Sequence, residues 1–495
     1  MAPWLTGNAK SALLPLLLAL CLVRFWVAPL PSSFWLDEMA TVFVAQQGSA
    51  HPSLADAAPQ AWRSWYYPVI RLNGAVWGYS EVATRMPSVL AMAAFLWILA
   101  GLVRRLIHSE AAWFAVFACL ALPGLNYQAA NARPYALGMC VFAAALLCLV
   151  RWLASGRWRD GLLFAASAAL VLYIHLLFWP TCLVFVLYAA ARVARGETPV
   201  NWKRAVLVFA LCALALLPVT AQTLSLLRDA RAHVIMPLPS LWQFLRSLEL
   251  TLVLGCAAAL WLIARVLRWR PDPTKLSLPA GVLIAGWWLG QPVLLYAFSW
   301  LTGDAVFVPR YLQLALPGAA LATTALAALF IPAGRWWCVS AVLALGVLLS
   351  QGQWRQPWPR HHNSDWRAAA RSVNQLEAAA AGEIPVICPS PFIEARPPAW
   401  RPDYPLPGFL YAHLAVYPIS GKVYLFPFEN SPPAESQAST LAQGALSSSR
   451  RFLIYGWGPQ VNFWRAWFAR RPEFAAWHQR RMGPFADVDV VLFEP

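Results

Sequence analysis

Long apolar blocks recur along the first 350 positions of the sequence. A helix needs about 20 apolar residues to cross the hydrocarbon core of a bilayer. Because lipid offers no hydrogen-bond partners, such segments must satisfy their backbone groups internally, as helices do. Composition agrees, since the chain is 60% hydrophobic and 12% charged, whereas soluble domains are about 25% charged. The alternating segments of an outer-membrane barrel are absent. The sequence therefore predicts an all-α polytopic membrane protein.

The blocks predict about eleven transmembrane helices, at 11–31, 86–103, 111–125, 134–152, 161–176, 177–191, 204–220, 248–264, 278–300, 310–331 and 336–352. Cations gather in short loops between blocks, for example Arg104 with Arg105 and Arg265 with Arg268. The positive-inside rule places these loops in the cytoplasm. The amino terminus is then cytoplasmic, and an odd number of spans places the tail outside. The net charge of +16 reflects this topology, and no nucleic-acid partner is predicted.

Two domains are predicted: a transmembrane module over 1–352 with a first external loop at 32–85, and an extracytoplasmic domain over 353–495. In the loop, "SWYYPVIRLNGAVWG" predicts an amphipathic interfacial helix. In the tail, "SDWRAAARSVNQLEAAAAG" predicts a helix capped by Ser364 and ending at Gly382. The runs "IPVICPS", "KVYLFPF", "RRFLIYGW" and "VDVVLFEP" predict strands, with "VNFWRAWFARRPEFAAWHQRR" as a helix between the last two. This alternation indicates a small α/β domain.

Adjacent carboxylates, Asp37 and Glu38 in "FWLDE", follow the first apolar block. They could be hydrated groups that cap a helix. A functional role is the alternative, because charge beside a membrane is costly. Arg85, Arg133 and Arg310 fall on or near the external side, against the positive-inside bias. Guanidinium groups bind phosphate oxygens as a fork. A carboxylate that takes a proton from a hydroxyl, with arginines that neutralise a leaving phosphate, is typical of transfer from a lipid-linked phosphate donor.

The order of these motifs resembles the GT-C glycosyltransferases, in particular bacterial members of the protein mannosyltransferase and aminoarabinose transferase group. The resemblance covers most of 1–370. It rests on "FWLDE", "YYPVIRLNGAVWGYSEVATRMPSVL", "NARPYAL", "YIHLLFWP", "PRYLQLALPG" and "DWRAAAR". Each motif is weak alone, and their order carries the signal.

The resemblance implies an integral membrane enzyme that moves a sugar from a polyprenyl-phosphate donor by an inverting displacement. The acceptor would be a glycolipid, a polysaccharide or a protein hydroxyl at the outer face of a bacterial inner membrane. No nucleotide pocket is implied. Asp37 would be the catalytic carboxylate, supported by Glu38. Donor phosphate contacts would come from Arg310, Tyr311, Arg133 and Arg63, and the site would be lined by Asn131, Tyr135, His175, Arg85 and Glu81.

Two departures from the family pattern bear on these roles. Asn131 stands where relatives carry an acidic residue, so Glu38 or Glu81 substitutes, or the acceptor differs. Trp62–Arg63–Ser64 replaces a His–Pro–Pro triplet, which removes a metal ligand. No Cys/His metal spacing occurs among the nine cysteines, so neither a metal site nor a cofactor is predicted, and dependence on a divalent metal stays open.

Structural interpretations compete with these roles. His175 also fits a satisfied core histidine, Arg85 an ordinary span cap, and the pair His361–His362 a solvated loop. At the level of the whole chain, a secondary transporter or flippase is the main alternative, although no inverted repeat or row of mid-span charges supports it. A membrane scaffold whose outer domain binds a partner is the third hypothesis.

Overall fold

The computed structural model describes residues 7–48, 51–54, 64–220, 237–271, 276–356, 358–380 and 382–495. These residues form two compact units, which are described separately. The first unit lies within Met1–Pro29, Ser64–Tyr66 and Arg85–Pro359. The second unit lies within Leu30–Arg63, Tyr67–Thr84 and Arg360–Pro495. The second unit thus combines parts of the first predicted loop with the carboxyl-terminal segment.

The first unit is helical, and a helix occupies the position of every predicted span. The α-helices are α1 (Gly7–Leu22), α5 (Glu81–Leu106), α6 (Ala112–Leu120), α7 (Pro123–Ala129), α8 (Tyr135–Ser155), α9 (Trp158–Ile174), α10 (Trp179–Ala194), α11 (Trp202–Ala215), α13 (Leu241–Ser247), α14 (Leu250–Val266), α15 (Leu278–Thr302), α16 (Leu316–Ala327) and α17 (Trp336–Gln351). The first four residues of α5 belong to the second unit. Shorter turns are η1 (Val23–Val27), η3 (Leu176–Phe178) and η5 (Pro309–Ala315).

Several of these helices satisfy the length and composition of a membrane span. Among the described residues, four helical stretches do so: Glu81–Leu106, Tyr135–Ser155, Leu176–Ala194 and Leu278–Thr302. Helices α13 and α14 make a fifth if their 53° bend lies within one span. Shorter apolar helices run over Ala12–Val27 and Trp336–Gln351. The protein is therefore a multi-pass membrane protein, while the figure of about eleven spans stays a prediction.

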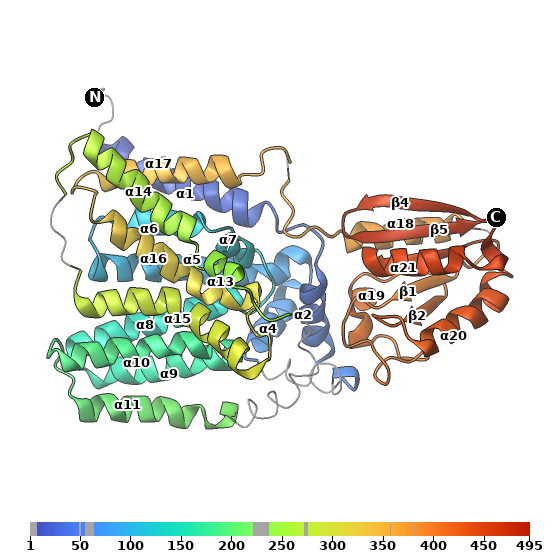
Figure 1. Ribbon diagram of the computed structural model, residues 1–495, viewed down its shortest axis with the longest axis horizontal. Coiled ribbons are helices and arrows are strands. Elements are labelled where there is room, and N and C mark those ends of the chain that lie inside the picture. The colour runs from blue at the N-terminus through green and yellow to red at the C-terminus, as the bar shows by residue number, and fades with distance from the viewer. Residues whose placement is uncertain are drawn as a thin grey trace. The chain divides into compact units, whose positions relative to one another are not determined.

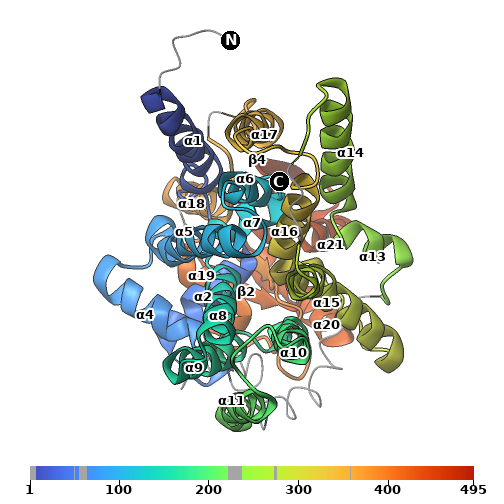
Figure 2. The same cartoon turned by 90° about the vertical axis from the view of Figure 1, so that its left-hand side faces the viewer.

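The helices of the first unit pack closely where glycine removes a side chain. Helices α8, α9, α10 and α11 run alongside one another (Figure 1), and Figure 2 views them nearly end on. A Cβ atom on Gly138 of α8 would lie 2.2 Å from Phe178, and one on Gly318 of α16 would lie 2.3 Å from the backbone nitrogen of Trp288 in α15. Both approaches therefore require glycine.

The second unit contains a five-stranded mixed sheet with the order β2-β1-β3-β5-β4. Strand β1 (Val386–Pro389) pairs in parallel with β2 (Val423–Phe426) and β3 (Phe452–Trp457), with Val386 opposite Val423. Strand β5 (Val488–Glu494) pairs antiparallel with β3 and with β4 (His478–Phe485). The four predicted strands are all present. Strand β4 is an addition to them.

Helices complete the core of the second unit. They are α2 (Leu36–Gln47), α4 (Tyr66–Trp77, from Tyr67 on), α18 (Trp366–Ala378), α19 (Ala412–Val416), α20 (Pro432–Leu441) and α21 (Gly458–Ala469). Short turns are η6 (Phe409–Tyr411), η7 (Ala442–Leu446) and η8 (Pro472–Phe474). Helices α18 and α21 pack on the sheet, and α2 packs on α19. One apolar cluster includes Phe43 of α2, Val373 of α18 and Ile454 of β3, so the first loop and the tail share a core.

Two local predictions were wrong. The cap of α18 is Asp365, whose Oδ1 accepts a hydrogen bond from Ala368 N at 3.1 Å. Ser364 instead forms a β-bridge with Ala486. The helix predicted through residue 481 ends at Ala469, because Pro472 cannot continue it. The exposed segment that follows is β4, which forms by pairing with β5. Its own pattern carries no strand alternation that would have revealed it.

His413 generates a pH prediction for this unit. The side chain is fully buried, with Nε2 3.2 Å from Cys388 Sγ, and burial lowers the pKa of His413 from 6.5 to about 3. Between these two values the unfolded chain binds a proton that the folded chain does not, so stability falls as the pH drops below 6.5. We expect His413→Gln to reduce the fall in melting temperature between pH 7 and pH 5, measured by thermal unfolding in detergent.

Tyr411→Phe is the matched control for this measurement. It removes a buried hydroxyl that donates to Phe426 O at 2.7 Å without removing a group that titrates in this range. It should lower the melting temperature equally at both pH values. An identical pH dependence in the wild type and in His413→Gln would contradict the prediction.

Candidate functional site

The two carboxylates of "FWLDE" lie in the first turn of α2 and have different surroundings. Glu38 is fully buried, and its Oε2 accepts a hydrogen bond from Trp35 N at 3.3 Å. Glu38 therefore acts as the cap of the helix start, where a negative charge is also favoured. Asp37 is only half-buried. Of the two, Asp37 is the carboxylate with surface left for a substrate.

Two histidines lie against this turn within the second unit. His361 Nε2 is 4.0 Å from Glu38 Oε1, and His361 is 8% exposed. The His362 ring stacks on Trp35, with ring centroids 5.1 Å apart and planes 9° from parallel. The prediction of a solvated loop at His361–His362 was therefore wrong for His361. Contacts with the two histidines fix this turn, because the His362 ring stacks on Trp35 and the His361 imidazole lies beside Glu38.

Glu81 serves as an anchor of the second unit. Its Oε1 accepts hydrogen bonds from Arg367 Nη1 at 2.9 Å and from Tyr417 OH at 2.8 Å. Arg367 also donates to Pro31 O at 2.8 Å, and its backbone N donates to Ser33 Oγ at 3.2 Å. The arginine of "DWRAAAR" thus ties α18 to both ends of the first loop. These bonds occupy one oxygen of Glu81 and give the motif a structural explanation.

A second group of predicted residues converges in the first unit; we call it the basic cluster. It consists of Arg133, Tyr135, His175, Arg310 and Tyr311. The ring centroid of His175 lies 5.6 Å from that of Tyr135 and 6.1 Å from that of Tyr311. Arg310 lies over the Tyr311 ring at 5.2 Å, with Nη2 3.4 Å from the hydroxyl. Separate segments of the sequence therefore meet at one place.

Breaks in helices position these side chains. Arg133 lies in the loop between α7 and α8, and Tyr135 is the first residue of α8. His175 ends α9 in an extended conformation (φ −156°, ψ 117°), and its Nδ1 accepts from Leu177 N at 3.3 Å. Pro309 begins η5, which carries Arg310 and Tyr311. Because each residue lies at the end of an element, its side chain can turn toward the others.

His175 lies near both arginines of the basic cluster. It lies between α9 and η3, outside both elements, and retains some exposed surface. Arg133 and Arg310 both lie close enough to His175 to act on it electrostatically. The imidazole adds hydrogen-bonding capacity to the cluster, beside the two guanidinium groups.

Part of the chain matches a protein-family model, and the whole chain is similar in fold to solved structures. Residues 65–221 match the family model described as dolichyl-phosphate-mannose-protein mannosyltransferase. In structure, the chain is similar to ArnT from Cupriavidus metallidurans bound to undecaprenyl phosphate, with a TM-score of 0.56, 14% identity and coverage of 97% of this chain and 98% of that chain. The apo form of ArnT gives a TM-score of 0.55 with 14% identity, covering 98% of this chain and 98% of that chain. The chain therefore has the fold of ArnT. The resemblance drawn from the motif order is thereby confirmed at the level of the fold.

A more distant likeness involves the arabinosyltransferase EmbB from Mycobacterium smegmatis. It gives a TM-score of 0.41 with 15% identity, covering 66% of this chain and 31% of that chain. No curated protein is significantly similar to the chain in sequence.

The remaining residues predicted for the site are Asn131, Arg85 and Arg63. Asn131 is buried, its Nδ2 donates to Gln128 Oε1 at 2.9 Å, and its O accepts from Ser88 Oγ at 2.6 Å. Arg85 is fully buried one turn before Ser88 on α5, which places it on the face that meets this loop. Arg63 lies outside the described residues.

Sequence reasoning missed Gln291. This residue is fully buried within α15, and its Nε2 donates to Tyr311 O at 2.7 Å and to Leu177 O at 3.4 Å. It therefore links the segment that carries Tyr311 to the turn that follows His175. The available signal was an amide in the middle of an apolar span, where a polar side chain is costly and usually functional.

The described residues do not form a metal site. Among them, no group of three or more His, Cys, Asp or Glu side chains could hold an ion. Near Asp37, Glu38 and His361 form only a pair, and Glu38 is already engaged with Trp35 N. These residues do not fit a divalent metal, so no step proposed below runs through one.

The Glu81–Arg367 contact generates a stability prediction. The two side chains are 15% and 34% exposed, so the pair is partly shielded from water. We expect a double-mutant cycle with Glu81→Gln and Arg367→Met to give a coupling of about 1–3 kcal/mol. The measurement is unfolding of the purified protein in detergent.

Arg396 and Glu429 provide the matched control pair in the same unit. Their side chains are 37% and 56% exposed at a distance of 2.6 Å. An exposed pair should couple by only about 0.2–1 kcal/mol. Equal coupling in the two cycles would show that Glu81 and Arg367 are no more than a surface ion pair.

Proposed function

We propose that the protein is an integral membrane glycosyltransferase that moves a sugar from a polyprenyl-phosphate donor to an acceptor hydroxyl. The observation that carries this proposal is the convergence of Arg133, Arg310 and Tyr311 around His175. The GT-C fold and the mannosyltransferase family match support it. A further support is that the structurally similar ArnT binds undecaprenyl phosphate.

The basic cluster would bind the phosphate of the donor. Arg310 is exposed and Arg133 half-buried, so a guanidinium at the surface and a second one deeper could contact the same phosphate. Each guanidinium group can donate two parallel hydrogen bonds to phosphate oxygens. The imidazole and the tyrosine hydroxyl can donate further hydrogen bonds. Their task is to stabilise the negative charge that grows on the phosphate as the sugar departs.

Asp37 would act as the general base. In the proposed step the acceptor oxygen attacks the anomeric carbon, and its proton passes to the Asp37 carboxylate. The bond between the anomeric carbon and the phosphate oxygen breaks, and its electron pair leaves with polyprenyl phosphate. One such displacement inverts the configuration of the sugar. Glu38 supports Asp37 by fixing the helix start. An acidic residue is missing at Asn131, and Glu81 is a weaker candidate than Glu38 to replace it, because Glu81 already accepts hydrogen bonds from Arg367 and Tyr417.

The cellular setting is part of the proposal. The amino terminus would lie in the cytoplasm of a bacterium, and the acceptor reaction would take place at the outer face of the inner membrane; the positions of the cationic loops support this orientation. The membrane supplies the lipid-linked donor, and a glycolipid, polysaccharide or protein supplies the acceptor. Transport of a lipid-linked glycan in proteoliposomes without a covalent product would favour the transporter or flippase alternative.

Asp37→Asn should abolish transfer. The amide keeps the size of the side chain but cannot accept the proton, so we expect turnover to fall by about 10²- to 10⁴-fold. The readout is mass spectrometry of cell-envelope lipids and glycans, together with the melting temperature of the purified variant. Asp403→Asn is the control, because the Asp403 side chain is 81% exposed. Unimpaired turnover in Asp37→Asn would refute its role as base.

Arg310→Ala should weaken use of the donor more than use of the acceptor. Loss of charge-assisted hydrogen bonds to phosphate costs about 1.5–3 kcal/mol, or roughly a 10- to 150-fold loss in kcat/KM for the donor. Steady-state kinetics with each substrate varied in turn makes the measurement. Arg335→Ala, in the exposed turn before α17, is the control. An equal loss for donor and acceptor would contradict the phosphate role.

A further inference from the structure

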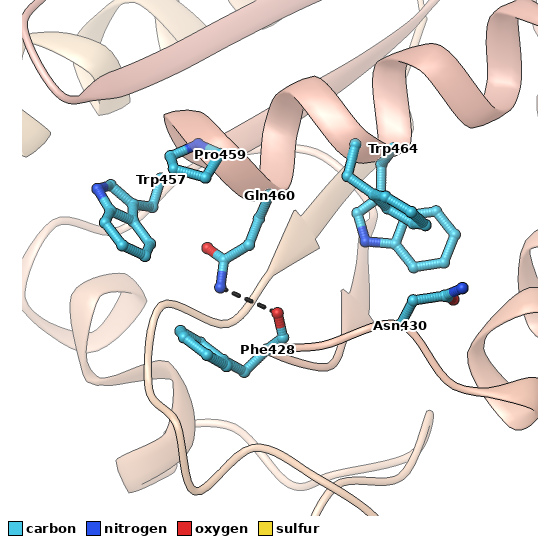
Figure 3. A pocket seen from close by; sticks show the side chains of 7 residues that line it. Phe428, Asn430, Trp457, Pro459, Gln460 and Trp464 are labelled. Carbon is cyan, nitrogen blue, oxygen red and sulfur yellow. Dashed lines mark hydrogen bonds between the residues drawn. The ribbon is translucent and has the colours of Figure 1, made fainter. Parts of the chain in front are cut away.

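The second unit contains an aromatic hollow that the proposed chemistry does not use. It has a volume of about 270 Å³ and lies among the loop after β2, the end of β3 and the start of α21. Its lining is Phe428, Asn430, Trp457, Pro459, Gln460, Phe463 and Trp464. Figure 3 shows Trp457 and Phe428 toward one side of it and Trp464 with Asn430 toward the other. We call it the aromatic hollow.

Aromatic rings in the hollow expose flat apolar surface. Trp457 is 39% exposed and Phe463 is 43% exposed, although large apolar side chains of a folded domain are normally covered. The rings of Phe428 and Trp457 lie 20° from parallel, with centroids 6.4 Å apart. Trp464 is 2% exposed and packs edge-on against Phe426 at 4.6 Å. The hollow therefore has one firmly packed wall and two exposed rings.

Amide groups lie among these rings. Gln460 is 8% exposed, and its Nε2 donates to Ser390 O at 3.0 Å and to Phe428 O at 3.1 Å (Figure 3). These bonds fix the amide, whose buried Oε1 has no hydrogen-bond partner among the described residues. Asn430 is held by a hydrogen bond from its Nδ2 to Glu435. Gln460 Oε1 is too buried to contact a ligand, whereas Asn430 is exposed, so its amide is within reach of a ligand hydroxyl.

A second hollow of about 440 Å³ adjoins the first. Trp457 and Pro459 line both, and Gly458, Asn462, Ala486 and Asp487 complete the second. Asp487 Oδ1 accepts from Asn363 Nδ2 at 3.0 Å, and Asn462 Oδ1 accepts from Arg481 at 2.6 Å. The second hollow thus has two polar lining residues, one of them ionisable, and Trp457 lies at the boundary between the two hollows.

The charge of the lining restricts the ligand. No Lys or Arg side chain lines either hollow, and Asp487 is the single ionisable group among the lining residues. The nearby Arg481 does not line the hollows, and its guanidinium is hydrogen-bonded to Asn462 and paired with Asp489 at 3.2 Å, so a phosphate or an anionic lipid headgroup would find no cation in the lining. An acyl chain would make no use of the polar side chains of Asn430, Asn462 and Asp487. A neutral, hydroxyl-rich ligand with flat apolar faces meets both conditions, and a few fixed polar groups in an aromatic setting are typical of small-ligand sites.

We propose that the two hollows bind adjacent sugar residues of the glycan acceptor. One ring would stack its C–H face on Trp457 and Phe463 in the aromatic hollow and form a hydrogen bond through a hydroxyl with the exposed Asn430. The next would lie beside Asn462 and Asp487. The identity of this glycan as the acceptor rests on the proposed function. The binding itself does not, because it requires no donor and no transfer.

The test is direct binding of the full-length protein in lipid nanodiscs to a printed panel of bacterial cell-envelope oligosaccharides, without donor. We expect at least one saccharide to bind, and Trp457→Ala and Phe463→Ala each to weaken that binding about tenfold. Trp77→Ala is the control, since Trp77 is 74% exposed in the same unit and lines neither hollow. Retention of the wild-type melting temperature establishes that each variant is folded.

Each outcome decides between the inference and its alternatives. Absence of saccharide binding, binding insensitive to both substitutions, or displacement by a proline-rich peptide would overturn the inference. Asp37→Asn should bind the saccharide as the wild type does while failing to transfer. If the wild type binds but never transfers, and Trp457→Ala loses binding, the transferase proposal alone is refuted.

Discussion

The cost of placing charge beside apolar surface governs where this chain keeps its few ionisable groups. Several charged side chains outside the cationic loops either form hydrogen bonds within the second unit or belong to the basic cluster. Glu81 accepts from Arg367 and Tyr417, and Glu38 accepts from a backbone amide. Arg133 and Arg310 act together on His175. The anchor made by Glu81 fixes the second unit, whereas the basic cluster concentrates positive charge in the first. Structural and chemical roles are thus distributed among residues that look alike in sequence.

The acidic motif illustrates this distribution. The two interpretations of Asp37 and Glu38, capping and chemistry, looked like alternatives, but the structure assigns capping to Glu38 and leaves Asp37 partly exposed. A capped first turn also restrains its neighbour, so the buried carboxylate contributes to the geometry of the exposed one. In the first unit, Gln291 has a comparable supporting position behind Tyr311.

Much of the fold could be predicted from sequence, because the signals were local. Apolar length located the helices of the first unit, and short apolar runs located β1, β2, β3 and β5. Predictions failed where long-range pairing decides. Strand β4 exists through β5, and the buried position of His361 depends on a segment more than 300 residues earlier, as its bond to Ser32 shows with a separation of 329. For the site, motif order indicated which residues converge, but not that Glu81 is engaged by Arg367. The aromatic hollow had no sequence signal, since Trp and Phe are abundant throughout.

The shared core of the second unit has a consequence for biosynthesis. Its first part, including α2 and Glu81, leaves the ribosome long before its partners, since Arg367 follows Glu81 by 286 residues. Most of the intervening chain must be inserted into the bilayer before the tail arrives. Until then Phe43 and its neighbours have no apolar surface of the tail to pack against. Membrane insertion therefore precedes completion of this unit, and truncating the tail would leave the early segment as an unfinished half-domain.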